Sequence, residues 1–335
     1  MKAAEGPWVE NRYNECGYRS AASCGLLPAW SRRVAVIGSS MGAGTFVPEP
    51  EAIPARLAAD LGAACGQPVQ SQTLAIPDFP IGKIAASAEE AMTLDPTAIV
   101  VTITSYDLAN TPGTGSAQAK PLIKSITDKV QATLKGFSTV YMAKEVFLSN
   151  EKAYLGFIAA QDRSDDQLAS ETKKGVAILA AQIDRMLEAD RDRHIPIVLT
   201  FMPDREEIGR VRLHPGHQDP APAALRRIAA ERGIPYVDGL SSLPENVPTA
   251  ALYYVANGHM NGIGDGYIAR GLATGLIRSV PTFEGCNLDR ATQLGMTGHL
   301  DENDQTAPAR RPIVARYPYQ SQGSDRGVAA PLRHH

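Results

Sequence analysis

The chain has 335 residues, of which 44% are hydrophobic and 21% are charged, and its formal net charge is -3. This length and apolar content are enough to bury the core of one large domain or two small ones. The balanced charge indicates neither a basic face for nucleic acid nor an acidic tail, so we expect a small or uncharged ligand, such as a small molecule or a glycan.

No stretch reaches the ~18 to 20 consecutive apolar residues of a membrane-spanning helix. Residues 1–31 lack the apolar run of a secretory signal, so a cytoplasmic location is the default expectation. The four cysteines, Cys16, Cys24, Cys65 and Cys286, show no Cys-x-x-Cys spacing. This spacing favours free thiols over a disulfide framework or a metal site.

Residues 32–280 alternate short apolar runs rich in β-branched residues with amphipathic helical patterns. The runs are residues 33–38, 68–76, 97–104, 195–202 and 234–240, and helical patterns follow at 51–65, 82–92 and 222–233. Runs too apolar to face water on either side, separated by helices, are typical of a parallel sheet covered on both faces. We therefore predict an α/β domain of three layers.

Three segments do not follow this alternation. Residues 117–175 contain helical patterns with no strand between them, which indicates a helical insertion over the strand ends. Residues 1–31 and 281–335 contain no apolar periodicity, so we expect a flexible N-terminal flank and a disordered C-terminal tail.

The first apolar run ends in the turn "GSSMGAG", residues 38–44, which allows two interpretations. Glycines after a strand could hold a dinucleotide phosphate, as in short-chain dehydrogenases, but that turn needs a helix to begin at once. Here Pro48, Pro50 and Pro54 delay the helix, because proline inside a helix costs ~3 kcal/mol. The turn is better suited to presenting a serine.

The same turn resembles the first sequence block of the SGNH/GDSL hydrolase superfamily, Gly-Asp-Ser-x-x-x-Gly. In this resemblance Ser40 takes the nucleophile position, and Ser39 stands where aspartate is usual. The second block resembles "QTLAIPDFP", where Ala75 takes the position that donates a backbone N–H to the oxyanion. The resemblance implies a flavodoxin-like fold, an ester substrate and no metal or organic cofactor.

The third block of the family, Gly-x-Asn-Asp, resembles "TSYD" after the third apolar run. Asp107 matches the final aspartate, while Thr104 replaces glycine and Tyr106 replaces the asparagine that donates to the oxyanion. A phenol can also donate one hydrogen bond, but from a longer arm. Tyr106 is therefore either a second oxyanion donor or an aromatic wall of the cleft.

The last block of the family resembles "NGHMNGIGDGYIA" before a helical pattern. His259 takes the position of the general base, and Asn261 is placed to cap the following helix. Asn257 stands where the family has the acid of the catalytic triad, and neither Asp238 nor Asp265 occupies that position. An amide oxygen can still orient the imidazole, although in serine proteases the change from Asp to Asn costs ~10⁴ in rate.

These residues predict a serine esterase, or an acyl or acetyl transferase, that acts on an ester of a carbohydrate or a small lipid. Ser40 would attack the carbonyl and His259 would carry the proton. The alternative from another class is a module that has lost catalysis and binds a glycan or a protein, which Asn257 and Tyr106 favour.

"HPGHQDP" brings His214, His217 and Asp219 together in a loop. Two histidines with no further ligand cluster are more often solvated than metal-bound. We therefore expect no metal site there.

Overall fold

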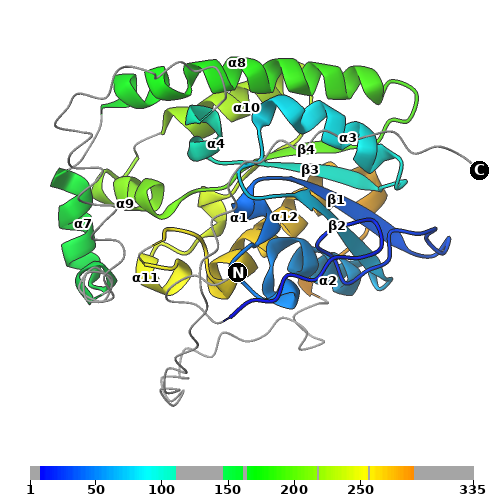
Figure 1. Ribbon diagram of the computed structural model, residues 1–335, viewed down its shortest axis with the longest axis horizontal. Coiled ribbons are helices and arrows are strands. Elements are labelled where there is room, and N and C mark those ends of the chain that lie inside the picture. The colour runs from blue at the N-terminus through cyan, green and yellow to red at the C-terminus, as the bar shows by residue number, and fades with distance from the viewer. Residues whose placement is uncertain (1–7, 111–145, 161–163, 217–218, 256, 290–335) are drawn as a thin grey trace, which may run out of the picture. The chain divides into compact units, whose positions relative to one another are not determined.

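The computed structural model describes residues 8–110, 146–160, 164–216, 219–255 and 257–289. Their centre is a five-stranded parallel sheet in the order β2-β1-β3-β4-β5 (Figure 1). The strands are β1 (Arg32–Gly38), β2 (Val69–Ala75), β3 (Ala98–Ile103), β4 (Ile197–Phe201) and β5 (Tyr236–Asp238). This is the flavodoxin-like strand order, and it confirms the predicted α/β fold class.

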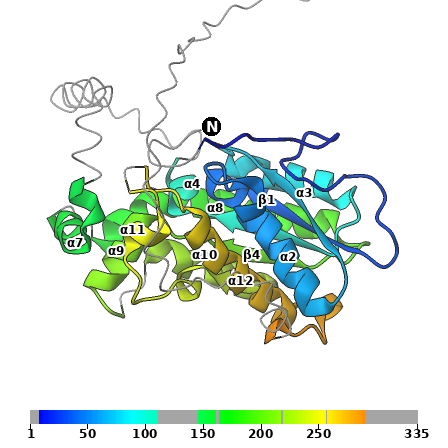
Figure 2. The ribbon, with the colours of Figure 1, turned by 90° about the horizontal axis from the view of Figure 1, so that it is seen from below.

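Helices cover both faces of the sheet (Figures 1 and 2). On one face lie α3 (Ile84–Met92), α4 (Ser105–Ala109), α8 (Asp165–Ala189) and α10 (Pro220–Arg232). On the other lie α2 (Ile53–Cys65) and α12 (Gly262–Ser279). The remaining helices, near the carboxyl ends of the strands, are α1 (Ser40–Ala43), α7 (Glu151–Ala160), α9 (Arg205–Leu213) and α11 (Thr249–Leu252).

Alternation along the strands separates two cores. In β1, Val34 and Val36 pack with α2 and α12, whereas Ala35 and Ile37 pack with α3 and α8. Successive side chains of a strand point to opposite faces, so a strand buried on both faces must be apolar throughout. This explains why the runs that predicted the strands are continuous rather than alternating.

The N-terminal flank differs from the sequence expectation. From residue 8 onward it packs on the domain: Val9 is buried, and the Ser20 hydroxyl donates to the Ser71 carbonyl. Cys16 and Cys24 form a disulfide, which corrects the prediction of free thiols. The described part of the flank is therefore held by this disulfide and by hydrogen bonds to the domain, not by an amphipathic helix or strand of its own.

The start of the C-terminal tail is also ordered, so the expected boundary at residue 281 lies too early. Phe283 is fully buried in the core between α2 and α12. Cys286 forms a disulfide with Cys65, the last residue of α2, and the Asn287 N–H donates to the Ala64 carbonyl. Residues 290–335 lie outside the described residues.

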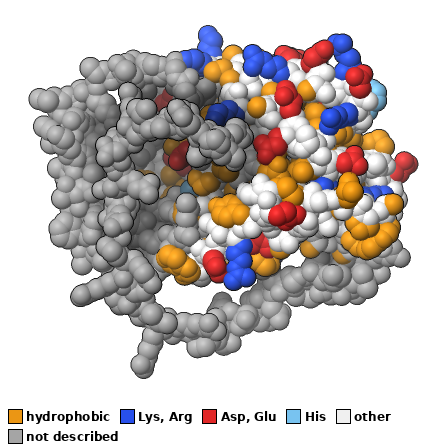
Figure 3. All heavy atoms as spheres, turned by 45° about the vertical axis from the view of Figure 1, so that its right-hand side comes forward, with side chains coloured by type: hydrophobic (Ala, Val, Ile, Leu, Met, Phe, Trp, Pro, Cys, Tyr) orange, Lys and Arg blue, Asp and Glu red, His pale blue; other side chains and the backbone are white. Residues whose placement is uncertain are grey.

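The expected helical insertion is only partly described, because residues 111–145 and 161–163 fall outside. Of the rest, α7 lies beside α9, while α8 packs on α3, α4 and α10 as part of the layer over the sheet. In the parts of the chain that the structure describes, no helix is long and apolar enough to cross a membrane. On the described part of the face in Figure 3, acidic, basic and apolar side chains are interspersed.

The two disulfides close loops of very different length, with sequence separations of 221 for Cys65–Cys286 and 8 for Cys16–Cys24. Loop-closure entropy grows with length, so we expect Cys65→Ser/Cys286→Ser to lose about 3 kcal/mol more stability than Cys16→Ser/Cys24→Ser, or ~6 to 12 °C in Tm. Differential scanning calorimetry of the two variants measures this. Equal shifts would contradict the entropic ordering.

Candidate active site

Ser40 lies directly after β1, as the first residue of the one-turn helix α1. Its Oγ is 2.8 Å from Nε2 of His259, which precedes α12 and is 219 residues away in the chain. The carboxyl ends of parallel strands meet at one edge of the sheet, and this is where the two side chains come together. The structure thus brings a hydroxyl and an imidazole into hydrogen-bonding contact.

Asn257 faces the other side of the imidazole. Its Oδ1 accepts from the backbone N–H of His259 at 2.8 Å and lies 3.2 Å from Nδ1 of the same residue. An amide oxygen can only accept, so Nδ1 carries the ring proton and Nε2 is left to accept from the Ser40 hydroxyl. Asn257 therefore selects the tautomer in which His259 can take a proton from serine.

The loop that carries His259 is held at both ends. The Tyr254 N–H donates to the His259 carbonyl at 2.8 Å. At the other end Asn261 is the N-cap of α12, as predicted, because its Oδ1 accepts from the N–H groups of Ile263 and Gly264. His259 therefore lies on a loop fixed to a long helix.

His259 is also enclosed by an aromatic ring. The Phe46 ring makes a T-shaped contact with the imidazole, with the ring centroids 4.6 Å apart and an angle of 73° between the planes. Burial disfavours the charged imidazolium and lowers the pKa of His259, although a hydrogen bond with the backbone of Asn257 opposes this. The ring is therefore kept in its neutral, proton-accepting form.

Asp107 connects the serine turn to α4. Its Oδ2 accepts from the Ser39 hydroxyl at 3.0 Å and from the Thr104 N–H at 2.9 Å, while the Thr104 hydroxyl accepts from the Asp107 N–H. The last two bonds form a capping box at the start of α4. Burial raises the pKa of Asp107, and these hydrogen bonds oppose the rise.

Tyr106 and Ala75 are the two positions where the sequence predicts oxyanion donors. Tyr106 lies at the cleft, but the Ala75 N–H does not point toward it. Tyr106 is 60% exposed and lines the cleft beside Ser40. Ala75 is the last residue of β2, at the edge of the sheet, and the next amide, that of Ile76, donates to the Gly38 carbonyl. Alternate amides of a strand point to opposite sides, so the Ala75 N–H points away from β1 and the serine turn.

Asp78, three residues after Ala75, lines the cleft instead. Its backbone is left-handed, with φ 55°, a conformation that favours glycine and that aspartate tolerates better than most residues. Asp78 lies inside the second block, "QTLAIPDFP", but the resemblance singled out Ala75 there as the oxyanion position.

The dyad opens into a cleft of about 530 Å³. One wall is apolar and comes largely from α7 and the segment before it. The side chains of this wall are Met41, Leu148, Tyr154, Phe157, Ile158 and Val255. The sequence did not predict this wall, because the residues of α7 were recognisable only as part of a helical insertion.

Arg205 at the start of α9 holds this wall in place. Its guanidinium donates to the Leu148 and Val255 carbonyls and lies 3.8 Å from the centre of the Tyr154 ring. Asp204, its neighbour, caps α9, and burial raises the Asp204 pKa to about 6. Arg205 is thus a buried support for the wall rather than an open cation.

In the loop with His214 and Asp219, the aspartate has a structural role, because it forms a buried ion pair. Asp219 Oδ2 accepts from Arg210 Nη2 at 2.7 Å, and both side chains are buried. His217 lies outside the described residues. Among the residues that the structure describes there is no His, Cys, Asp and Glu group able to hold a metal ion.

The serine turn also differs from a dinucleotide turn. α1 has only four residues and ends at Gly44, which is left-handed, and α2 begins at Ile53. A pyrophosphate site needs a long helix that starts at the glycines. The short α1 does not provide one.

Comparisons with known proteins give structural likeness only. No protein-family model and no curated protein matches the chain. Similar solved structures include a catalytic mutant of Axe2, an acetylxylan esterase from Geobacillus stearothermophilus, with 13% identity, 76% of this chain and 96% of that chain covered, and a TM-score of 0.44. The lipase Lip_vut3 from a goat rumen metagenome is 12% identical, with 73% of this chain and 97% of the lipase covered and a TM-score of 0.41. TesA has 11% identity, 73% and 98% coverage and a TM-score of 0.42. These likenesses are too slight to assign the site, which depends on the distances given above.

The enclosure of His259 makes its titration a direct test of this geometry. Because its pKa is lowered by burial, we expect an NMR titration of the ring to have its midpoint below the ordinary value of about 6.5. The unfolded chain then binds the proton more readily, so this residue's contribution to stability is lost as pH falls below about 6.5. The His259→Gln spectrum assigns the resonance, and a midpoint above 6.5 would contradict the burial.

Proposed function

We propose that the protein is a serine hydrolase of carboxylic esters, with the site organisation of the SGNH/GDSL superfamily. The observation that carries the proposal is the 2.8 Å contact between Ser40 Oγ and His259 Nε2, with Asn257 oriented on Nδ1. A serine hydroxyl is a weak nucleophile unless a hydrogen-bonded base takes its proton. This arrangement supplies that base in the correct tautomer.

In the proposed reaction Ser40 Oγ attacks the acyl carbonyl carbon while its proton passes to His259 Nε2. The bond from that carbon to the alcohol oxygen then breaks, and His259 returns the proton to the leaving alcohol. Water, deprotonated by the same nitrogen, then attacks the acyl-serine. The bond from the acyl carbon to Ser40 Oγ breaks, His259 returns the proton to Oγ, and the acid is released. A second alcohol in place of water would make the reaction an acyl transfer.

We place the oxyanion against backbone amides. Ser40 is the first residue of α1, and the first N–H groups of a helix have no acceptor within it. The Ser39 hydroxyl does not cap them, since it donates to Asp107. The loop after β2, where Asp78 lines the cleft, is the proposed source of a second donor in place of Ala75.

The binding-module alternative is favoured by Asn257, which brings no negative charge to the imidazolium formed in the transition state. Two substitutions distinguish the hypotheses. If the site is catalytic, Ser40→Ala abolishes turnover of a generic ester, and Asn257→Asp raises it about ten- to a hundredfold, or ~1.4 to 2.8 kcal/mol of barrier.

The measurement is kcat/KM on p-nitrophenyl esters, together with covalent labelling by a fluorophosphonate probe. Ser39→Ala is the matched control at the neighbouring serine and should keep the labelling site at Ser40. A folded Asn257→Asp variant that neither turns over esters nor reacts with the probe would establish the binding module instead.

The apolar wall from α7 supports an acyl group longer than acetyl. Each methylene buried on this wall contributes about 0.8 kcal/mol, which corresponds to a roughly fourfold gain in kcat/KM. Across esters from acetyl to hexanoyl we therefore expect kcat/KM to rise with chain length. Phe157→Ala, at the partly exposed end of the wall, should flatten this rise. Acetyl as the best substrate would rule out the wall as an acyl site.

A further inference from the structure

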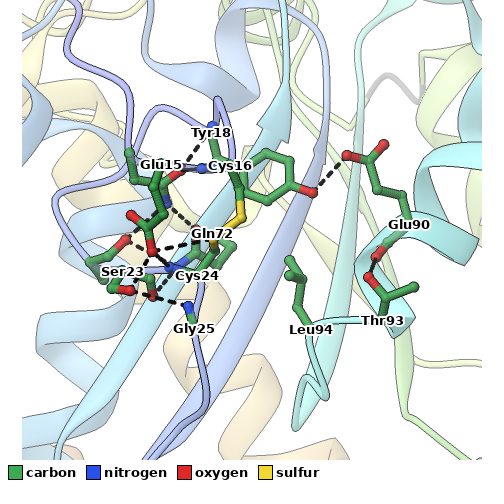
Figure 4. The surroundings of a disulfide bond; sticks show 12 residues. Glu15, Cys16, Tyr18, Ser23, Cys24, Gly25, Gln72, Glu90, Thr93 and Leu94 are labelled. Carbon is green, nitrogen blue, oxygen red and sulfur yellow. Dashed lines mark hydrogen bonds between the residues drawn. A yellow bond between two sulfur atoms is a disulfide. The ribbon is translucent and has the colours of Figure 1, made fainter. Parts of the chain in front are cut away.

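The N-terminal flank includes a loop closed by the Cys16–Cys24 disulfide (Figure 4). Glu15 Oε1 accepts from the Cys24 N–H, and the Asn14 Oδ1 accepts from the N–H groups of Cys16 and Tyr18. The Asn14 amide also donates to Gln72 Oε1 on β2 at 2.8 Å. The loop is therefore fixed both internally and to the edge strand of the sheet.

Arg19 extends from this loop to the serine turn, although its side chain is only 6% exposed. Its Nη1 donates to the Ala43 carbonyl at 2.5 Å and its Nη2 to the Val47 carbonyl at 2.6 Å. Its Nε donates to Asn11 Oδ1 at 2.6 Å. The planar fork of a guanidinium suits this double contact, since it presents two parallel N–H donors in fixed geometry.

The Ala43 and Val47 carbonyls lie at the two ends of a short segment, residues 43–47, that contacts both Ser40 and His259. Ala43 ends α1, which Ser40 begins, and the Thr45 N–H and hydroxyl both donate to the Ser40 carbonyl. Phe46, just before Val47, is the residue whose ring contacts the His259 imidazole. Residues 43–47 therefore contact both members of the dyad.

We propose that Arg19 is a positioning residue for catalysis, which fixes residues 43–47 so that Ser40 and the Phe46–His259 contact keep their reactive geometry. The inference rests on the proposed esterase function. It assigns a role to the disulfide loop, which lies outside the sequence blocks that suggested the site. Arg19 touches no reacting atom and acts through the Ala43 and Val47 carbonyls.

The test compares Arg19→Ala, Arg19→Lys and the matched control Arg12→Ala, whose side chain is exposed in the same flank. Displacing a catalytic pair by a fraction of an ångström costs roughly tenfold, so we expect Arg19→Ala to lower kcat about tenfold or more with KM within about twofold. Lysine keeps the charge but lacks the planar fork that holds both carbonyls in fixed geometry, so Arg19→Lys should fall between. Arg12→Ala should match the wild-type protein.

A second measurement does not depend on activity. The ring of His259 is contacted by the Ser40 hydroxyl, the Asn257 amide and the Phe46 ring, so its pKa reports on the placement of Phe46. In Arg19→Ala the NMR titration of His259 should move up toward the ordinary value of about 6.5, because the ring becomes more hydrated. Phe46→Leu should move it the same way with Arg19 intact.

The outcomes separate this inference from the proposed function. A wild-type protein without turnover or probe labelling overturns the esterase, yet the His259 titrations still test the positioning role. A variant whose Tm falls while kcat and the His259 midpoint stay at wild-type values shows a structural role only and overturns the inference. If Arg19→Ala does not fold, Arg19→Lys and Phe46→Leu decide by the same two measurements.

Discussion

The site depends on how closely the serine turn packs on β3. A Cβ at Gly38 would lie 1.9 Å from Thr102 Oγ1, and one at Gly42 would lie 2.2 Å from the same atom. The Thr102 hydroxyl in turn donates to the Ile37 carbonyl at 3.0 Å. Any side chain at these two positions would push α1 away from the sheet, and Ser40 with it. The glycines are required by this approach rather than by a phosphate.

With the turn seated on β3, neighbouring groups fix its orientation from three sides. Asp107 holds Ser39 from α4, and the flank holds Ala43 and Val47 through Arg19. His259 approaches from the loop before α12. Burial disfavours the charged imidazolium, so the His259 ring is neutral at rest, and its Nε2 lies against the Ser40 Oγ. Preorganisation of this kind reduces the reorganisation needed during reaction.

The features that depend on residues close together in the chain could be predicted from the sequence. Apolar runs identified the strands, and Asn261 was recognisable as a helix cap because its side chain bonds amides two and three residues away. The pairing of Ser40 with His259 was expected from the resemblance to the SGNH/GDSL sequence blocks, and the shared edge of parallel strands explains how residues so far apart in the chain can meet.

Other parts depend on tertiary contacts that leave no periodic signal. Cysteine spacing could not show that Cys65 meets Cys286, and a helical pattern could not show that Tyr154 lines the cleft. The direction in which the Ala75 N–H points depends on the register of β2, and a shift of one residue in that register reverses the direction.

The Cys65–Cys286 disulfide has a topological consequence. It closes the chain into a covalent ring that contains β2, β3, β4 and β5, together with His259 and Asn257. β1 lies outside the ring in sequence, yet in the sheet it stands between β2 and β3, two members of the ring. The covalent ring by itself therefore contains His259 but not Ser40. The two halves of the site meet only when the strand that carries the serine fills the central gap of the sheet.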